Sequence, residues 1–215
     1  MPAKIWLCGR RLTLAIPGED GPSLDFINLA LDDEYGLRQL PFQPGTILDV
    51  GANFGLFSLL AAHYFPKAAI HAYEPNPRIF PDAVANVSLV GATAIQAGVG
   101  SHSGLAAIRE MGDSRLAQTI PSDSGSIQIV SLRDAIGRMG GALDLLKLDC
   151  EGAEWDIFKD VEALRQVRLI RMEYHLTDGR SLDDLTIHAK RLGFHIERLE
   201  PNQGFGIAWL SRIVT

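Results

Sequence analysis

Acidic side chains accompany three apolar, strand-like runs of this chain. Asp49 lies in the first run, Glu74 ends the second, and Asp149 and Glu151 end the third. In an open parallel sheet the carboxyl ends of the strands meet at one edge, where ligands bind. We therefore expect these four carboxylates to gather at one site. There they could accept hydrogen bonds from a ligand's hydroxyl groups or take up a proton.

A glycine-rich turn follows the first of these acids. Gly51 and Gly55 stand at its ends, with Ala52 and Asn53 between them, and a helical pattern follows. Glycine permits a positive φ and a close approach of backbone to ligand, and the N–H groups that begin the helix add hydrogen-bond donors. The turn predicts a site for a nucleoside, with Glu74 accepting hydrogen bonds from the ribose hydroxyls.

Two cofactor classes bind to a turn of this kind, dinucleotides and S-adenosylmethionine. A dinucleotide turn has the pattern G-x-G-x-x-G, whose glycines let the backbone approach the pyrophosphate. Here the spacing is Gly51-x-x-x-Gly55, and no third glycine follows. S-adenosylmethionine has no phosphate, so the spacing favours it. A turn that binds nothing is the alternative at this point.

The third acidic segment, Lys147-Leu-Asp-Cys-Glu-Gly-Ala-Glu154, makes the pattern more specific. Together with Asp49 to Gly55 and Glu74 to Pro77, it resembles the FkbM family of S-adenosylmethionine-dependent methyltransferases. Glu173, at the end of a later strand, also matches, and the resemblance runs from residue 45 to residue 175 approximately. Cys150 stands where the family more often has Val, and Gly98 where it usually has Ala.

The resemblance implies a fold, a cofactor and a reaction. The fold is α/β and Rossmann-like, a doubly wound, mostly parallel seven-stranded sheet of the class I methyltransferases with a closing antiparallel hairpin. The cofactor is S-adenosylmethionine, and the family methylates hydroxyl groups of sugars and natural products. A hydroxyl acceptor loses a proton during the reaction, so a carboxylate or histidine must take it.

The expected site residues follow the strands of the sheet. Those expected to bind the cofactor are Asp49, Gly51, Ala52, Asn53, Gly55, Glu74, Pro75, Asn76, Gly98 and Asp149. The expected catalytic residues are Glu151, Asp149, Glu173 and His175. Either Asp149 or Glu151 could be the base, and we favour Glu151 because it lies farther from the strand. As alternatives, both acids could cap the next helix, and His175 could be a plain exposed histidine. Glu154 is expected to be a helix cap.

Other functional classes remain open at this point. One is a nucleoside-binding module without catalysis, and another is an NAD-dependent dehydrogenase. A hard cation such as Mg²⁺ would suit an oxygen-rich set made of Asp149, Glu151, Glu173 and His175. No spacing in the sequence demands it, so no metal is expected.

Composition and charge limit the classes of partner expected for this chain. The chain has 215 residues, a net charge of −6 and no dense basic tract, which disfavours a nucleic-acid partner. Its two cysteines, Cys8 and Cys150, predict no disulfide framework and fit a reducing compartment, so we expect a cytoplasmic protein. The stretch from Leu56 to Phe65 is about half the length of a membrane span. The expected partner is a small hydroxylated acceptor, and a homodimer is possible.

One domain is expected, with residues 1–44 as an N-terminal extension and residues 45–215 as the cofactor-binding core. Strands that alternate with helices predict a parallel sheet. One helix is expected from Pro77 to Leu89, capped by Asn76, and another from Glu154 to Val161. The segment from Met111 to Thr119 is polar and is expected to be irregular.

Overall fold

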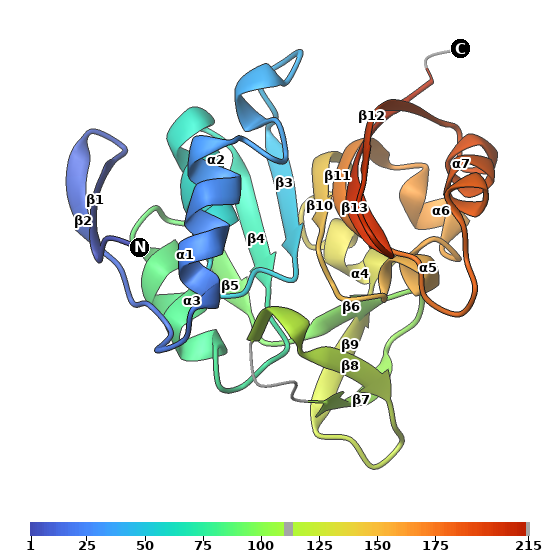
Figure 1. Cartoon of the computed structure of the whole chain (residues 1–215), viewed down its shortest axis with the longest axis horizontal. Coiled ribbons are helices and arrows are strands. Elements are labelled where there is room, and N and C mark those ends of the chain that lie inside the picture. Colours follow the sequence, from blue (N-terminus) through green and yellow to red (C-terminus); the bar gives the residue numbers. More distant parts are fainter. Residues whose placement is uncertain (110–113, 214–215) are drawn as a thin grey trace.

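The computed structural model describes residues 1–109 and 114–213. A seven-stranded sheet runs through the middle of the molecule in the order β12-β13-β11-β10-β3-β4-β5 (Figure 1). Its strands are β3 (Thr46–Val50), β4 (Ala69–Tyr73), β5 (Thr93–Ile95), β10 (Leu143–Leu148), β11 (Val167–His175), β12 (Phe194–Pro201) and β13 (Phe205–Arg212). Neighbouring strands from β5 to β11 are parallel, and β13 is antiparallel to both of its neighbours. The expected mostly parallel sheet with a closing hairpin is confirmed.

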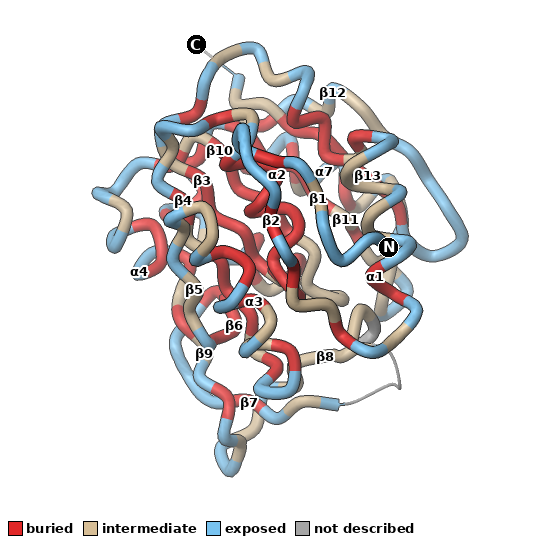
Figure 2. The backbone as a smooth tube through the Cα atoms, turned by 90° about the vertical axis from the view of Figure 1, so that its left-hand side faces the viewer, coloured by how far each residue is buried: buried red, intermediate tan, exposed pale blue. Residues whose placement is uncertain are grey.

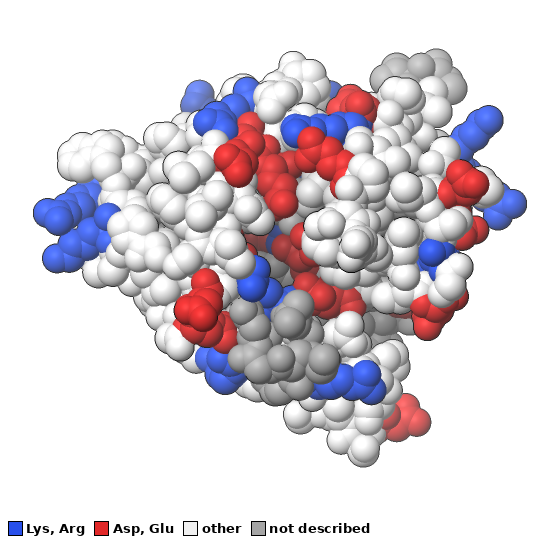
Figure 3. Space-filling view, in the orientation of Figure 1, with Lys and Arg blue, Asp and Glu red and all other residues white. Residues whose placement is uncertain are grey.

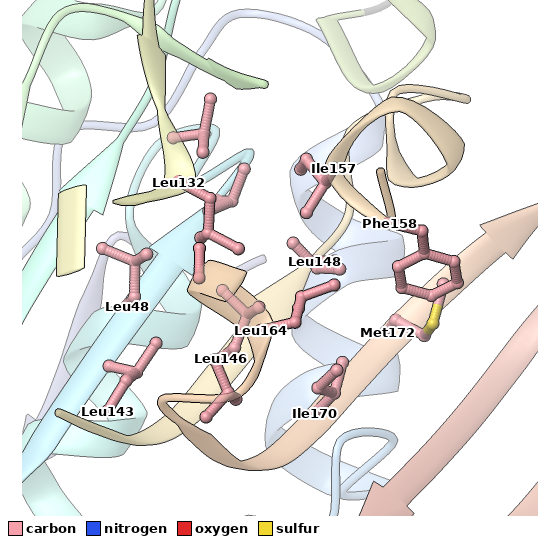
Figure 4. Close-up of a cluster of buried hydrophobic side chains, with 14 of the residues drawn as sticks. Leu48, Leu132, Leu143, Leu146, Leu148, Ile157, Phe158, Leu164, Ile170 and Met172 are labelled. Carbon is pink, nitrogen blue, oxygen red and sulfur yellow. The ribbon is translucent and has the colours of Figure 1, made fainter. Parts of the chain in front are cut away.

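The inner strands form because their apolar runs are covered on both faces. Strands β3 and β10 are buried almost throughout, as parallel strands with helices on both sides must be. One core contains Leu48, Leu146 and Ile170 with the side chains drawn in Figure 4. The opposite face packs Ile47 and Leu145 into a second core. Because successive side chains of a strand point to opposite faces, each strand contributes side chains to both cores.

The helices lie on the two faces of this sheet. They are α2 (Leu56–Tyr64), α3 (Phe80–Ser88), α4 (Leu132–Gly137), α5 (Glu154–Ile157), α6 (Val161–Leu164) and α7 (Leu182–Arg191). Ser181 and Asp184 form a capping box at the start of α7.

Two predicted helices have different bounds. Helix α3 begins at Phe80 and not at Pro77, because the Asn76 side chain accepts the N–H of Arg78 and forms a separate turn first. The helix expected from Glu154 to Val161 is divided into α5 and α6, since the Asp160 side chain accepts the N–H of Ala163 and starts a new helix.

A second, four-stranded sheet of order β6-β9-β7-β8 lies next to the main sheet (Figure 1). Its strands are β6 (Gly98–Gly100), β7 (Gly104–Arg109), β8 (Gln118–Pro121) and β9 (Ile127–Ser131), with a 3₁₀ turn η3 (Ser114–Leu116) before β8. The prediction of an irregular segment from Met111 to Thr119 is therefore wrong where β8 begins; residues 110–113 lie outside the described residues. The polar residues gave no strand pattern for β8, which forms because it pairs with β7.

The N-terminal segment packs against the second core. It consists of the hairpin β1 (Lys4–Leu7) and β2 (Arg10–Thr13), then α1 (Gly21–Asp25), a π-helical turn η1 (Phe26–Leu31) and η2 (Leu37–Gln39). The hairpin is exposed on its outer side (Figure 2), but Leu7 and Leu12 are buried. The Trp209 indole donates a hydrogen bond to the carbonyl of Glu34 at 2.9 Å. A division of the chain at residue 45 stays a prediction.

Candidate active site

A cleft of about 500 Å³ opens beyond the carboxyl ends of β3, β4, β10 and β11. Acidic side chains gather in a hollow in the middle of this face of the molecule (Figure 3). The acids that line the cleft are Asp25, Glu34, Glu74, Asp149, Glu151 and Glu173. Of the four carboxylates expected to meet at one sheet edge, Glu74, Asp149 and Glu151 line the cleft, whereas Asp49 does not.

The glycine turn lines one end of this cleft. Gly51 has φ 76°, and a Cβ there would lie 1.7 Å from the carbonyl oxygen of Asp149. Only glycine fits, because the turn crosses directly over the end of β10. The N–H groups of Gly51 and Ala52 both donate to the carbonyl of Tyr73 at 3.0 Å. The close approach that glycine permits here is to the protein's own backbone.

Two of the residues predicted to bind the cofactor, Asp49 and Gly55, do not line the cleft. Gly55 begins α2 with φ 88°, and a Cβ there would lie 2.7 Å from Cγ1 of Val87. Gly55 thus lets α3 approach the turn. The other predicted cofactor residues all lie in the lining: Gly51, Ala52, Asn53, Glu74, Pro75, Asn76, Gly98 and Asp149.

Asp49 acts on the turn through Lys147. The Asp49 side chain is fully buried, accepts a hydrogen bond from Ser58 Oγ at 2.7 Å, and lies 3.2 Å from Lys147 Nζ. Lys147 donates to the carbonyl of Gly51 at 2.6 Å and lies 3.5 Å from Asp149 Oδ2. Burial alone would lower the pKa of Lys147, but the two carboxylates raise it overall, so the amine stays charged. A lysine inside an apolar strand was the signal for this role, since a buried lysine needs partners.

Tyr35, from the N-terminal segment, also binds Asp149, at the same carboxylate oxygen that faces Lys147. Its hydroxyl donates to Asp149 Oδ2 at 3.0 Å, and the residue is only 2% exposed. Its ring packs edge-on against Phe57 at 5.6 Å. Burial, together with the charge of Asp149, raises the pKa of Tyr35 well above its ordinary value, which keeps the phenol a donor. Sequence reasoning missed this contact because no local pattern connects residues 114 positions apart.

Glu74 is held by two backbone donors. The N–H groups of Asn53 and Asn76 each donate to one of its carboxylate oxygens at 2.8 Å, and the residue is 7% exposed. Burial raises the pKa of Glu74 to about 7, and the two N–H groups and Lys147 oppose that rise. Each carboxylate oxygen has a second lone pair, so the group can still accept hydrogen bonds from a diol.

Glu151, Glu173 and His175 come together at the other end of the cleft. His175 Nε2 lies 3.2 Å from Glu173 Oε1 and 3.4 Å from Glu151 Oε2. Glu173 and His175 are two positions apart on β11, so their side chains leave the strand on the same face. Glu151 stands in the turn after β10 with φ 53°. The four predicted catalytic residues thus share one cleft.

Glu154 supports this cluster, and the sequence prediction assigned it only a capping role. Its Oε1 accepts the N–H groups of Cys150 at 3.1 Å and Gly152 at 3.3 Å, and lies 3.5 Å from His175 Nδ1. Trp155 Nε1 donates to the carbonyl of His175 at 2.6 Å. Glu154 therefore shapes the turn that carries Glu151 and also faces the histidine ring.

Burial and mutual repulsion set the protonation of these groups. Burial, with the charges of Asp149, Glu173 and Glu154, raises the pKa of Glu151 to about 8, although His175 opposes that rise. Burial also raises the pKa of Glu173. For His175, burial lowers the pKa, but the neighbouring carboxylates outweigh it and raise the pKa to about 11. Three carboxyl groups, those of Glu151, Glu154 and Glu173, thus lie around one histidine ring.

Glu34 is a lining acid that the sequence analysis did not single out. Burial, with the charges of Glu173 and Asp149, raises its pKa to about 7. It belongs to the N-terminal segment, where no motif marks it, and only the docking of that segment brings it to the cleft.

The donors and acceptors of the cleft fit S-adenosylmethionine. Glu74 suits ribose hydroxyls, while Phe54, Pro75 and Val99 add apolar surface for a base. The acids near Asp149 suit the ammonium and sulfonium charges of the cofactor. S-adenosylmethionine carries no phosphate, so its binding needs neither a phosphate-binding cation nor the third glycine of a dinucleotide turn.

Comparison with known proteins decides the family. The profile of the Methyltransferase FkbM domain matches residues 49–204. This chain belongs to the FkbM methyltransferase family. Within that family, the match covers the glycine turn, Glu74 and all four predicted catalytic residues, but leaves Glu34 and Tyr35 outside. Membership in this family and the fold together imply the use of S-adenosylmethionine.

Two relatives of this FkbM-family chain carry the name of a methyltransferase. It is 32% identical over 186 residues to the 31-O-demethyl-FK506 methyltransferase FkbM of Streptomyces tacrolimicus, with 67% of this chain and 71% of the relative aligned. It is 30% identical over 173 residues to methyltransferase sdnD of Sordaria araneosa, with 61% of this chain aligned. The latter match spans 65% of the relative, slightly less than two thirds of its length.

Solved structures similar to this chain show the fold. A S-adenosylmethionine-dependent methyltransferase from Aquifex aeolicus superposes with a TM-score of 0.51 at 13% identity, covering 89% of this chain and 96% of that one. The methyltransferase domain of METTL16 also gives 0.51, at 15% identity, with 95% and 74% covered. Within the described residues, no helix has the length and apolar character needed to cross a bilayer.

Proposed function

We propose that this FkbM-family chain transfers a methyl group from S-adenosylmethionine to a hydroxyl oxygen of a sugar or natural-product small molecule. One observation carries the proposal: the acid and histidine cluster shares a single cleft with the glycine turn and Glu74. A relative is named for a demethylated natural product, 31-O-demethyl-FK506, which supports this acceptor class.

The residues at the glycine turn would hold the cofactor. Glu74 would accept hydrogen bonds from the ribose hydroxyls, and Asn53 and Asn76 keep its carboxylate in place. Asp149, fixed by Tyr35 and Lys147, would face the amino-acid part of the cofactor. Bound S-adenosylmethionine supplies a methyl group on a sulfonium, which is already a good leaving group.

The acid and histidine cluster would hold the acceptor. Glu151 is our candidate for the group that takes the hydroxyl proton, because Asp149 already accepts from Tyr35 and pairs with Lys147. Glu173 and His175 would orient the hydroxyl. Their strand, β11, pairs with β10 on one side and β13 on the other, which holds its backbone in place. Placement is the main contribution of the protein to such an in-line displacement.

Two measurements test the proposal. Calorimetry should show binding of S-adenosylhomocysteine and no comparable binding of NADH. Incubation with methyl-labelled S-adenosylmethionine and a panel of hydroxylated acceptors should label at least one acceptor, at an oxygen located by mass spectrometry. Binding of NADH in place of S-adenosylhomocysteine would overturn the cofactor assignment, and label found only on nitrogen or carbon would overturn the acceptor class.

A further inference from the structure

Three side chains have the arrangement of metal ligands. They lie at the end of the cleft away from the glycine turn, which we call the acceptor end. Glu151, Glu173 and His175 each offer one ligand atom, and these atoms all lie within 4.8 Å of one another. We propose that this triad binds one divalent cation of the Mn²⁺ and Mg²⁺ class. The sequence alone favoured no metal. The proposal rests on the proposed function for its role beside the acceptor, but the binding itself does not depend on that function.

The distances within the triad are close to those between neighbouring ligands of one cation. Two ligands at right angles around a cation, each with a bond of about 2.1 Å, lie about 3 Å apart. His175 Nε2 lies 3.2 Å from Glu173 Oε1 and 3.4 Å from Glu151 Oε2, so small side-chain movements would complete one face of an octahedron. A ring nitrogen carries at most one hydrogen, so Nε2 cannot make a good hydrogen bond to both carboxylates at once.

A second observation comes from the opposite side of the histidine ring. Glu154 is 1% exposed, and its Oε2 has no hydrogen-bond partner among the described residues. Its Oε1 lies 3.5 Å from His175 Nδ1, another buried atom without a hydrogen bond in this part of the chain. Histidines that bind metals usually donate their second ring N–H to a carboxylate, which fixes the ring. Glu154 stands where such a supporting carboxylate belongs.

Two of the three ligands, Glu173 and His175, lie on a rigid element, strand β11. The backbone of Glu173 pairs with Ile207 and that of His175 with Phe205 in the β11–β13 ladder. The Phe205 ring stacks on the His175 ring at 6.2 Å with an interplanar angle of 20°. Ligands held on paired strands keep their geometry better than ligands on loops. Three protein ligands would leave coordination positions open to water or to an acceptor hydroxyl, whose pKa the cation would lower. Glu151 offers one oxygen to the cation, and its other oxygen would take the hydroxyl proton.

Manganese binding tests the proposal without an activity measurement. Protein treated with EDTA and desalted should take up one Mn²⁺ per chain, measured by calorimetry and by loss of the free-ion electron paramagnetic resonance signal. Glu173→Gln and His175→Ala should each weaken this binding by 100-fold or more. Glu154→Gln should weaken it by about 10–100-fold, the usual effect of a residue that supports a ligand. His195→Ala is the matched control, since His195 is an exposed histidine on β12 and should have no effect.

The outcomes separate this inference from the proposed function. Each variant is also titrated with S-adenosylhomocysteine, which reports folding and the cofactor site. A wild-type protein that binds S-adenosylhomocysteine but no Mn²⁺ overturns the metal site alone. Equal Mn²⁺ binding by wild type and His175→Ala means an adventitious ion only, and also overturns it. If a β11 variant fails to fold, Glu151→Gln, in a turn outside the core, gives the same test.

Discussion

The two ends of the cleft are built in different ways. At the cofactor end, which holds the glycine turn and Glu74, backbone N–H groups position the carboxylate: Glu74 accepts hydrogen bonds from Asn76, two residues along the chain, and from Asn53 in the glycine turn. At the acceptor end, side chains from β11 and from the turn after β10 hold one another, and Glu154 and Trp155 support them. Local backbone geometry tolerates changes in distant residues, whereas a side-chain cluster depends on every element that meets there. We expect cofactor binding to survive changes that abolish the chemistry.

The largest effect should come from the acceptor end. Glu151→Gln keeps the size of the side chain and removes its ability to take a proton, so kcat should fall by about 10²–10⁴-fold. The dissociation constant of S-adenosylhomocysteine should change little, because Glu74 and Asp149 are untouched. Asp149→Asn should do the opposite: it should weaken S-adenosylhomocysteine binding and change kcat little. Glu162→Gln, on the exposed side of α6, is the matched control. Loss of thermal stability alone in both site variants would favour the capping interpretation.

Removal of the ribose partner should have the next largest effect. Glu74→Ala deletes a charged hydrogen-bond acceptor, which should weaken S-adenosylhomocysteine binding by about 1.5–3 kcal/mol, or roughly 10–150-fold. Calorimetry measures the change, and circular dichroism should show an unchanged fold because Glu74 lies at a strand end. Binding equal to that of the wild type would show that ribose is held elsewhere.

The same carboxylate predicts a pH dependence of cofactor binding. The pKa of Glu74 is raised to about 7 by burial, and ribose hydroxyls bind best to the ionised form. The affinity should therefore be highest above pH 7 and should fall as the pH drops through 7, by about tenfold between pH 8 and pH 6. Titrations of S-adenosylhomocysteine across this range measure it. Glu74→Gln should give a flat profile, and an equally steep profile in that variant would assign the titration to another group.

The smallest effect should come from the N-terminal segment. Tyr35→Phe removes one hydrogen bond to Asp149, and should weaken S-adenosylhomocysteine binding by about 0.5–1.5 kcal/mol. A double-mutant cycle with Asp149→Asn should give a coupling energy of similar size. Additive effects of the two substitutions would mean that Tyr35 acts only through core packing.

The sequence by itself determined the central sheet and the glycine turn. The apolar runs of β3 and β10 specify buried parallel strands, and a glycine such as Gly51 marks a turn that no side chain could enter. Both signals are local, because a strand or a turn depends on a few consecutive residues. The capping box at Ser181 was predictable for the same reason.

Only the tertiary structure decided which residues support the site. Glu34 reaches the cleft, and Tyr35 reaches Asp149, because Trp209 binds the N-terminal segment. Glu154 faces His175 because β10 and β11 lie side by side. Strand β8 likewise exists through its pairing with β7 and not through its own polar residues. Such contacts join residues far apart in the chain, and their free energy depends on burial and charge that arise only when the elements pack together.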